Sequence, residues 1–439
     1  MRWRDEYRSR LVSAPEAVRR LESGQRVVIG HACAEPQALV RELVAQGERL
    51  ADVEIVHMVP MGEAAYCSPG MRGHFRHNSL FAGPPTRRAI EDGDADYTPV
   101  FFSEVPDLLR RGLPVDVALV HLSPPDRHGW CSFGLSVDYT KPAAQAARTV
   151  IAQVNPQMPR TLGDSFIHVS ELDAIIEVDE PVIELPRPQI GEVEAGIGGN
   201  CAALVRDGDT LQLGIGAIPD AVALSLRDKK DLGIHSEMLS DGVVDLIEAG
   251  VVTGRRKNFH PGRSVVSFLM GTRRLYDFVD DNPSVEMAPV DFVNNPAVIA
   301  RNDNLVSINS CVQIDLLGQV VSTSVGPRQI SGVGGQVDFV RGASMSAGGR
   351  TVMALASTAR EGKISKIVPL IDSGAAVTTS RYDVDYVVTE HGVAQLRGKT
   401  SRQRSRELIS VAHPDFRDQL AAEHERRHHE AWATDAVPL

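Results

Sequence analysis

Glu237 is the residue of this sequence best placed to do covalent chemistry. It follows a short apolar strand predicted over residues 232–235, and Ser240 or Asp241 caps the helix predicted to come next. In open α/β sheets, ligands bind at the carboxyl ends of the strands, which is where this carboxylate falls. A carboxylate there can act as a nucleophile and form a covalent acyl intermediate. A solvated loop acid or an ion-pair partner is the alternative interpretation.

Histidines are the next candidates for chemistry. His235 lies two positions before Glu237, so both side chains share one face of an extended segment, where His235 orients the carboxylate, contacts the substrate or belongs to the core. Near the C-terminus, a metal site at His424, His428 and His429 competes with a solvated helix face, which is favoured because no cysteine or spaced acid accompanies them. The sequence has no H-E-x-x-H motif and no G-x-S-x-G elbow, so a metal enzyme and a serine hydrolase are both disfavoured.

Two glycine-rich segments are candidates to hold a ligand near the nucleophile. Residues 214–216 lie between a predicted strand and a predicted helix, where free backbone N–H groups attract an anion or a developing oxyanion. Pro219 replaces the third glycine of G-x-G-x-x-G, so this is no dinucleotide fingerprint, and a tight turn is the alternative. Residues 331–335 lack the G-K-[ST] ending of a P-loop, but their glycines permit close backbone approach to a ligand or movement of a lid.

The elements that must position these groups alternate between short apolar strands and helices, which predicts βαβ units and mostly parallel sheets. Three prolines within residues 180–188 interrupt the pattern, so we place a domain boundary there and predict two α/β domains, 1–188 and 189–439. The predicted strands are 26–30, 53–59, 117–120, 150–154, 210–213, 232–235, 265–269, 305–308, 352–355, 376–379 and 386–388, and the predicted helices include 36–50, 142–148, 219–227, 241–248 and a charged segment from 401.

The composition is that of a globular protein with a core, because 43% of the 439 residues are hydrophobic and 23% are charged. The net charge of -11 disfavours nucleic acid as a partner. No run approaches the ~18 apolar residues of a membrane helix, no apolar signal segment is visible, and the five cysteines are dispersed. These features predict a cytoplasmic protein with reduced thiols and no membrane partner, and base rates favour a homodimer.

Several longer motifs occur together in the order of one known family. They are residues 102–106, 123–126, 134–138, 155–161, 214–222, 235–238, 331–336 and 388–392. On these motifs the chain resembles the acetyl-CoA hydrolase/transferase family over nearly its whole length, most closely the 4-hydroxybutyrate (or butyrate/acetate) CoA-transferase branch. The resemblance implies two α/β domains of the CoA-transferase fold, an interdomain site and a CoA-transferase working through a glutamyl-CoA thioester. An acyl-CoA hydrolase on the same fold and a non-catalytic CoA-ligand sensor are the alternatives.

The resemblance also implies roles for individual residues. Glu237 takes the position of the glutamate that carries the thioester, Asn294 matches an asparagine that faces the acyl carboxylate, and Glu390 matches a second glutamate near the site. The residues expected to contact CoA are Gln212, Leu213, Gly214, Ile215, Gly216, Gly334, Gly335 and Lys363. CoA and short carboxylates are implied as substrates, with no permanently bound cofactor and no metal. Close relatives often carry an acidic residue where this chain has Thr323, so that loop does not predict the acyl group.

Overall fold

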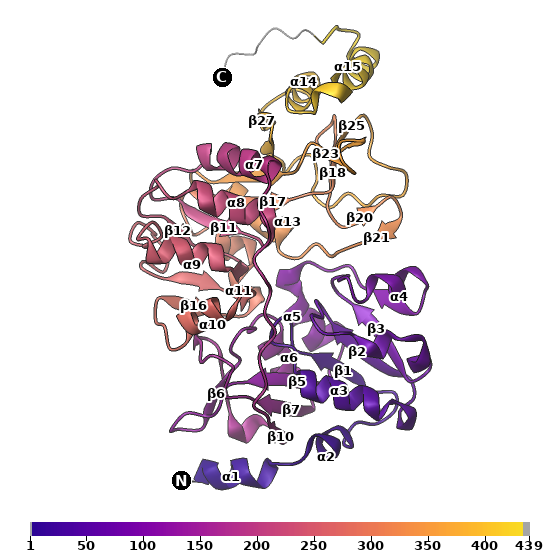
Figure 1. Cartoon of the computed structure of the whole chain (residues 1–439), viewed down its shortest axis with the longest axis vertical. Coiled ribbons are helices and arrows are strands. Elements are labelled where there is room, and N and C mark those ends of the chain that lie inside the picture. The colour runs from indigo at the N-terminus through magenta and orange to yellow at the C-terminus, as the bar shows by residue number, and fades with distance from the viewer. Residues whose placement is uncertain (1, 433–439) are drawn as a thin grey trace.

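The computed structural model describes residues 2–432. Two helix-covered sheets lie one above the other along the long axis of the molecule, the first in its lower half and the second in its upper half (Figure 1). A single cluster of buried apolar side chains extends from strands of the first sheet to strands of the second. The two halves therefore pack on a common core. The α/β class with mostly parallel sheets is confirmed.

The first sheet consists of β1 (Arg26–Ile29), β2 (Val53–His57), β3 (Phe75–Ser79), β4 (Ala95–Tyr97), β5 (Val117–Leu122), β7 (Thr149–Val154) and β10 (Ala174–Glu177). All seven strands are parallel, in the order β10-β7-β5-β1-β2-β3-β4. Because β5 and β1 lie in the middle, their apolar residues are buried, as their sequences predict. The strand order reverses between β1 and β5, and the carboxyl ends of strands at such a point are where open α/β sheets usually bind ligands.

Helices and one long connection complete the first half. The helices are α1 (Arg2–Arg10), α2 (Ala14–Val18), α3 (Gln37–Ala45), α4 (Arg87–Glu91), α5 (Val105–Asp107) and α6 (Thr140–Ala146). Residues 178–190 then contain no helix or strand and run as a single connection from β10 to α7 (Glu192–Ala203) (Figure 1). The predicted domain boundary at residue 188 falls in this connection. Its prolines account for the missing regular structure.

The second sheet consists of β11 (Thr210–Leu213), β12 (Gly233–Ile234), β17 (Leu305–Ser310), β22 (Arg350–Ala354), β26 (Tyr386–Thr389) and β27 (Gly392–Gln395). Its order is β12-β11-β17-β22-β26-β27, and every pair is parallel except β26 with β27. The helices of this half are α8 (Ala217–Ser225), α9 (Asp241–Glu248), α10 (Arg273–Val279), α11 (Val290–Val293), α12 (Pro296–Ile299), α13 (Gln336–Met345), α14 (Ser401–Ser410) and α15 (Pro414–His428).

Three of the predicted elements differ from the structure by more than a shift of about two residues at their ends. The predicted strand 376–379 is wrong, since that segment forms only an isolated bridge between Thr379 and Val320 and leaves Val377 largely exposed. The predicted strand 265–269 is divided into β14 (Ser264–Val266) and β15 (Phe268–Leu269), which pair with β16 (Val285–Met287) and β13 (Met238–Leu239), respectively. The predicted helix 36–50 ends at Ala45, and the 3-10 turn Gly47–Arg49 follows.

The C-terminal helices α14 and α15 pack against each other at the far end of the second half (Figure 1). His424 is buried there, and its Nδ1 lies 3.0 Å from the Ser405 hydroxyl. Across residues 2–432, no three histidine, cysteine or acidic side chains gather in a way that could hold a metal ion. Within the same range, no helix has the length and apolar character needed to span a membrane.

Candidate active site

The backbone of Glu237 is fixed between two small strand pairs. The Glu237 carbonyl accepts hydrogen bonds from the N–H groups of Ser267 at 2.9 Å and Phe268 at 3.2 Å. Just before it, the Ser236 N–H donates to the Val265 carbonyl at 3.0 Å. These bonds use the backbone at the break between β14 and β15, which explains why residues 265–269 do not form one strand. The Glu237 side chain is thereby held at the end of β12, as its place in the sequence predicts.

The Glu237 side chain lines a cavity of about 200 Å³ between the two halves of the molecule. The other lining residues include Phe81 from the first half and, from the second half, Gln212, Leu213, Gly214, Met238, Asn309, Ser310, Ser322, Ser331, Gly332, Val333, Gly334, Gly335 and Gln336. The two predicted glycine-rich segments therefore meet around the predicted nucleophile. The Phe102 N–H donates to the Gly334 carbonyl at 3.4 Å, which ties the second glycine segment to the first half.

Asn294 and Gly335 contact the Glu237 carboxylate directly. The amide of Asn294, at the end of α11, donates from Nδ2 to Glu237 Oε2 at 2.7 Å. A Cβ atom at Gly335 would lie 2.0 Å from that same oxygen and 2.5 Å from Asn294 Nδ2. Only a residue without a side chain leaves room for this arrangement. Asn294 is fully buried, and its Oδ1 has no hydrogen-bond partner among the described residues.

The environment of Glu237 makes its carboxylate unusually basic. Burial raises the pKa of Glu237 to about 8, and the negative charges of Asp338 and Asp138 act in the same direction. The hydrogen bonds from Asn294 and the Gly335 backbone lower this pKa but do not offset the burial. The ionised form of a carboxyl with a raised pKa is more basic than an exposed carboxylate, and it becomes the major form only as the pH rises to this pKa.

Gln212 lines the same cavity as Glu237 because β11 is the parallel neighbour of β12, the strand that leads to Glu237. Gln212 pairs in register with Ser307, and its Oε1 accepts from Ser307 Oγ at 2.7 Å and from Asn309 Nδ2 at 3.1 Å. This buried amide network fixes the floor of the cavity. Ile215 and Gly216 lie outside the cavity: they line a separate, small hollow beside residues 185–188, where the Ile215 side chain is exposed.

Lys363 and Glu390 do not line the Glu237 cavity. The Lys363 side chain is exposed in the turn between β23 (Thr358–Ala359) and β24 (Ile364–Ser365), with Nζ 3.6 Å from the Glu361 carboxylate. Glu390 occupies the turn between β26 and β27, and its carboxylate accepts from the N–H of Ser357 at 2.9 Å and from the Ser357 hydroxyl at 2.5 Å. Neither residue is among those that line the cavity.

His235 belongs to the core. It is completely buried, its Nε2 donates to the Val293 carbonyl at 2.9 Å, and its ring packs near Phe259 and Phe339. Burial lowers the pKa of His235 to about 3, so this side chain is neutral. The histidine thus helps to attach α11, which carries Asn294, to the strand that leads to Glu237.

Several residues of the site were not predicted from the sequence. Asn309 and Ser310 directly follow the predicted strand 305–308, so their place at a strand's carboxyl end was a usable signal. Asp338 and Ser103 form a hydrogen-bonded pair between the two halves, and their separation of 235 residues leaves no local signal.

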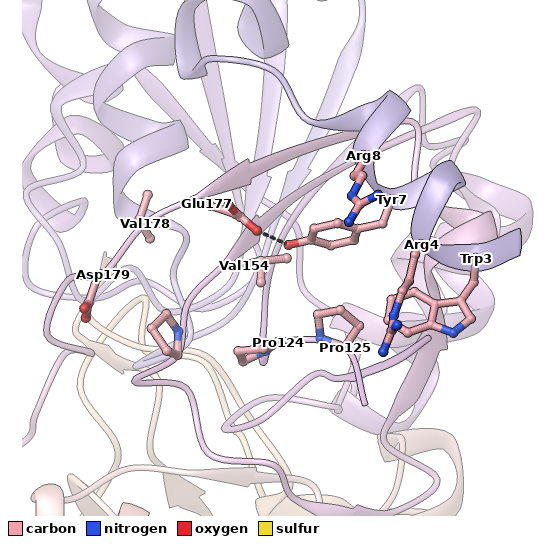
Figure 2. A pocket seen from close by; sticks show the side chains of 11 residues that line it. Trp3, Arg4, Tyr7, Arg8, Pro124, Pro125, Val154, Glu177, Val178 and Asp179 are labelled. Atoms are coloured by element: carbon pink, nitrogen blue, oxygen red, sulfur yellow. Dashed lines mark hydrogen bonds between the residues drawn. The ribbon is translucent and has the colours of Figure 1, made fainter. Parts of the chain in front are cut away.

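A larger cavity of about 640 Å³ lies beneath α1 in the first half (Figure 2). Tyr7 crosses it and donates from its hydroxyl to Glu177 Oε1 at 2.8 Å. Trp3, Arg4 and Arg8 complete its α1 side. None of the predicted site residues lines this cavity. The Glu237 cavity is therefore the candidate active site because of the residues that line it, and not because of its size.

Comparison with known proteins gives matches to both halves of the chain. The acetyl-CoA hydrolase/transferase N-terminal domain matches residues 1–185, and the C-terminal domain of that name matches residues 271–424. The 4-hydroxybutyrate coenzyme A transferase of Clostridium kluyveri is 60% identical over 97% of this chain and 100% of its own length. A solved 4-hydroxybutyrate CoA-transferase from Porphyromonas gingivalis has a TM-score of 0.85 and 47% identity, covering 97% of this chain and 100% of that one. RipA from Yersinia pestis has a TM-score of 0.92 and 40% identity, covering 98% and 100%.

Proposed function

The chain belongs to the acetyl-CoA hydrolase/transferase family, and from this premise we propose that it is a CoA-transferase that moves CoA from a short-chain acyl-CoA to a carboxylate acceptor. Donors of the 4-hydroxybutyryl, butyryl and acetyl class are favoured by the 4-hydroxybutyrate CoA-transferases that this chain resembles. The observation that carries the proposal is the Glu237 carboxylate, held by Asn294 and Gly335 in a cavity between the two halves.

The proposed reaction passes through two acyl exchanges on Glu237. A Glu237 oxygen attacks the thioester carbonyl, so that a C–O bond forms, the C–S bond breaks, and an acyl-glutamyl anhydride and CoA thiolate result. The thiolate then attacks the glutamyl carbonyl, which forms the glutamyl-CoA thioester and releases the acyl group as a carboxylate carrying one Glu237 oxygen. An acceptor carboxylate reverses both steps, restores the Glu237 carboxylate and leaves as the new acyl-CoA.

Backbone and amide donors around Glu237 support this chemistry. Each exchange passes through a tetrahedral oxyanion, and one well-placed donor to such an oxyanion is typically worth ~3 kcal/mol. The Gly335 N–H, the Gly214 segment and the Asn294 amide are the donors we assign to this role. Because the donors are already in place before substrate binds, they cost no reorganisation during the reaction.

The remaining predicted residues are assigned to parts of CoA that lie beyond the thioester. Gln212, Leu213 and Gly334 line the cavity and are proposed to contact the end of the pantetheine arm. Ile215 and Gly216 lie just outside it, and the exposed Lys363 ammonium is proposed to meet a CoA phosphate. Glu390 is proposed to act near the substrate. We further propose that the protein acts as a cytoplasmic homodimer with no permanently bound cofactor.

The decisive experiment is intact-protein mass spectrometry after incubation with acetyl-, butyryl- and 4-hydroxybutyryl-CoA. We expect a CoA-sized adduct in the unmodified protein, none in Glu237→Gln, and an unchanged adduct in Glu248→Gln, a surface ion-pair partner of Arg274. Absence of an adduct in the unmodified protein, or full activity of Glu237→Gln, would overturn the proposal. CoA release that needs no acetate would instead identify an acyl-CoA hydrolase, and CoA binding without turnover would identify a sensor.

A further inference from the structure

A carboxylate and a serine from the two halves of the molecule meet beside the active site. Asp338 lies in the first turn of α13, three residues after Gly335, and only 3% of its surface is exposed. Its Oδ2 accepts from the Ser103 N–H at 3.0 Å and its Oδ1 accepts from the Ser103 hydroxyl at 2.8 Å. Ser103, which belongs to the motif at residues 102–106, is therefore bonded to Asp338, a buried acid that has no role in the reaction proposed above.

Asp338 has no ion-pair partner among residues 2–432: its carboxylate accepts hydrogen bonds from Ser103, and the cation that acts on it is the exposed Arg341. The charged groups that face it are Glu104 from the first half and Arg341 from the next turn of α13; both residues are exposed, and the Arg341 guanidinium lies 5.6 Å from the centre of the Phe101 ring. Burial raises the pKa of Asp338 to about 7, against the opposing effect of the two Ser103 hydrogen bonds.

The charged groups that face Glu237 are acidic as well. Asp338 acts on it from α13, and Asp138 acts on it from the segment before α6. Asp138 is itself paired with His31, whose Nδ1 lies 2.8 Å from Asp138 Oδ2. Asp338 has no such paired group and is opposed only by the exposed Arg341, so it is the less compensated of the two negative charges.

We propose that Asp338 is a positioning residue that favours the glutamyl-CoA thioester by destabilising the free Glu237 carboxylate, with Ser103 holding its charge in place. This proposal rests on the proposed function. In the overall half-reaction, Glu237 and acyl-CoA give the glutamyl thioester and a free carboxylate, so one negative charge leaves the site with the product. Above its pKa of about 7, Asp338 carries a negative charge that repels the Glu237 carboxylate but not the uncharged thioester. Asp338 therefore shifts the equilibrium toward the thioester.

This role has a pH signature that a purely structural role lacks. At pH values where Glu237 is protonated, its conversion to the thioester also releases a proton, so the ratio of CoA-linked to free protein (the adduct-to-free ratio) rises tenfold per pH unit. Above the pKa of Glu237 this ratio becomes constant. Asp338 raises the energy of the ionised carboxylate alone. The protein with and without Asp338 should therefore have the same ratio at low pH and different plateaus at high pH.

Asp338→Asn is the informative variant because an asparagine carbonyl still accepts from the Ser103 N–H while the charge is lost. We expect its adduct-to-free ratio, measured by acid-quenched mass spectrometry at a fixed ratio of acyl-CoA to carboxylate, to equal that of the unmodified protein at pH 6. At pH 9 we expect it to be about tenfold lower, the equivalent of one pKa unit. The matched control is Asp291→Asn, which removes a partly exposed carboxylate that also joins the two halves, through Arg110 at 3.0 Å, and it should match the unmodified protein at both pH values.

The outcomes separate this inference from the function on which it rests. An equal ratio for Asp338→Asn at pH 9 overturns the inference while the thioester mechanism stands. A ratio lowered equally at pH 6 and pH 9 assigns Asp338 a purely structural role and also overturns it. The absence of any adduct in the unmodified protein overturns both proposals. Thermal unfolding of each variant verifies that the compared proteins are folded.

Discussion

Replacing Gly335 with alanine should disable the site without disturbing the fold. The Gly335 backbone has φ -88° and ψ 3°, which alanine adopts without strain. The new Cβ would lie 2.0 Å from Glu237 Oε2, whereas real Cβ contacts are not found below 3.0 Å. The carboxylate must therefore retreat by about 1 Å, which breaks its 2.7 Å hydrogen bond with Asn294. A displacement of that size in a reacting group costs about 10²-fold in kcat, or roughly 2.7 kcal/mol.

The assay is steady-state transfer of CoA from butyryl-CoA to acetate, with melting curves to verify folding. Gly199→Ala is the matched control, because Gly199 lies on the exposed side of α7 and a Cβ there would meet nothing within 4 Å. We expect unchanged kcat for this control and a small gain in stability, up to ~1 kcal/mol. If Gly335→Ala retained the kcat of the unmodified protein, the close approach of Gly335 to Glu237 would not matter, and the account of the site would be refuted.

Three further predictions concern the ionisation of Glu237. Since the nucleophile must be ionised and its pKa is raised to about 8, kcat/KM should rise with pH through about 8; a rate that is flat between pH 6 and 9 would contradict this. Asn294→Ala removes a donor that lowers this pKa, so the midpoint should move to higher pH and the rate should fall at least about tenfold; an unmoved midpoint would argue against it. The pKa of Glu237 in the folded protein lies above its unfolded value of 4.5, so the stability that Glu237 contributes at low pH is lost as the pH rises toward 8. Glu237→Gln should therefore melt at a higher temperature than the unmodified protein at pH 9, by the equivalent of a few kcal/mol, but not at pH 4.5. Equal differences in melting temperature at both pH values would speak against that assignment.

The local sequence determined most helices and strands and the position of the candidate nucleophile, Glu237. Apolar runs of β-branched residues are buried in the middle of parallel sheets, so the strands at 117–120 and 305–308 are recognisable from pattern alone. Glu237 is similarly recognisable, because a carboxylate directly after such a strand lies at the edge where ligands bind. The strand predicted at 376–379 was wrong because the same local propensity occurs there without a neighbouring strand to supply a full ladder of hydrogen bonds.

Tertiary structure alone decided how Glu237 is held and charged. Asn294 lies 57 residues away in sequence, and Asp338 meets Ser103 across 235 residues, so no local pattern encodes either contact. The glycine-rich sequence around Gly335 predicted that the backbone there permits close approach of a ligand. Only the fold shows that the Glu237 carboxylate occupies the space that a side chain at position 335 would fill. A pKa depends on burial and on neighbouring charges in three dimensions. The sequence therefore identifies the candidate nucleophile, and the packing of the two halves sets its basicity.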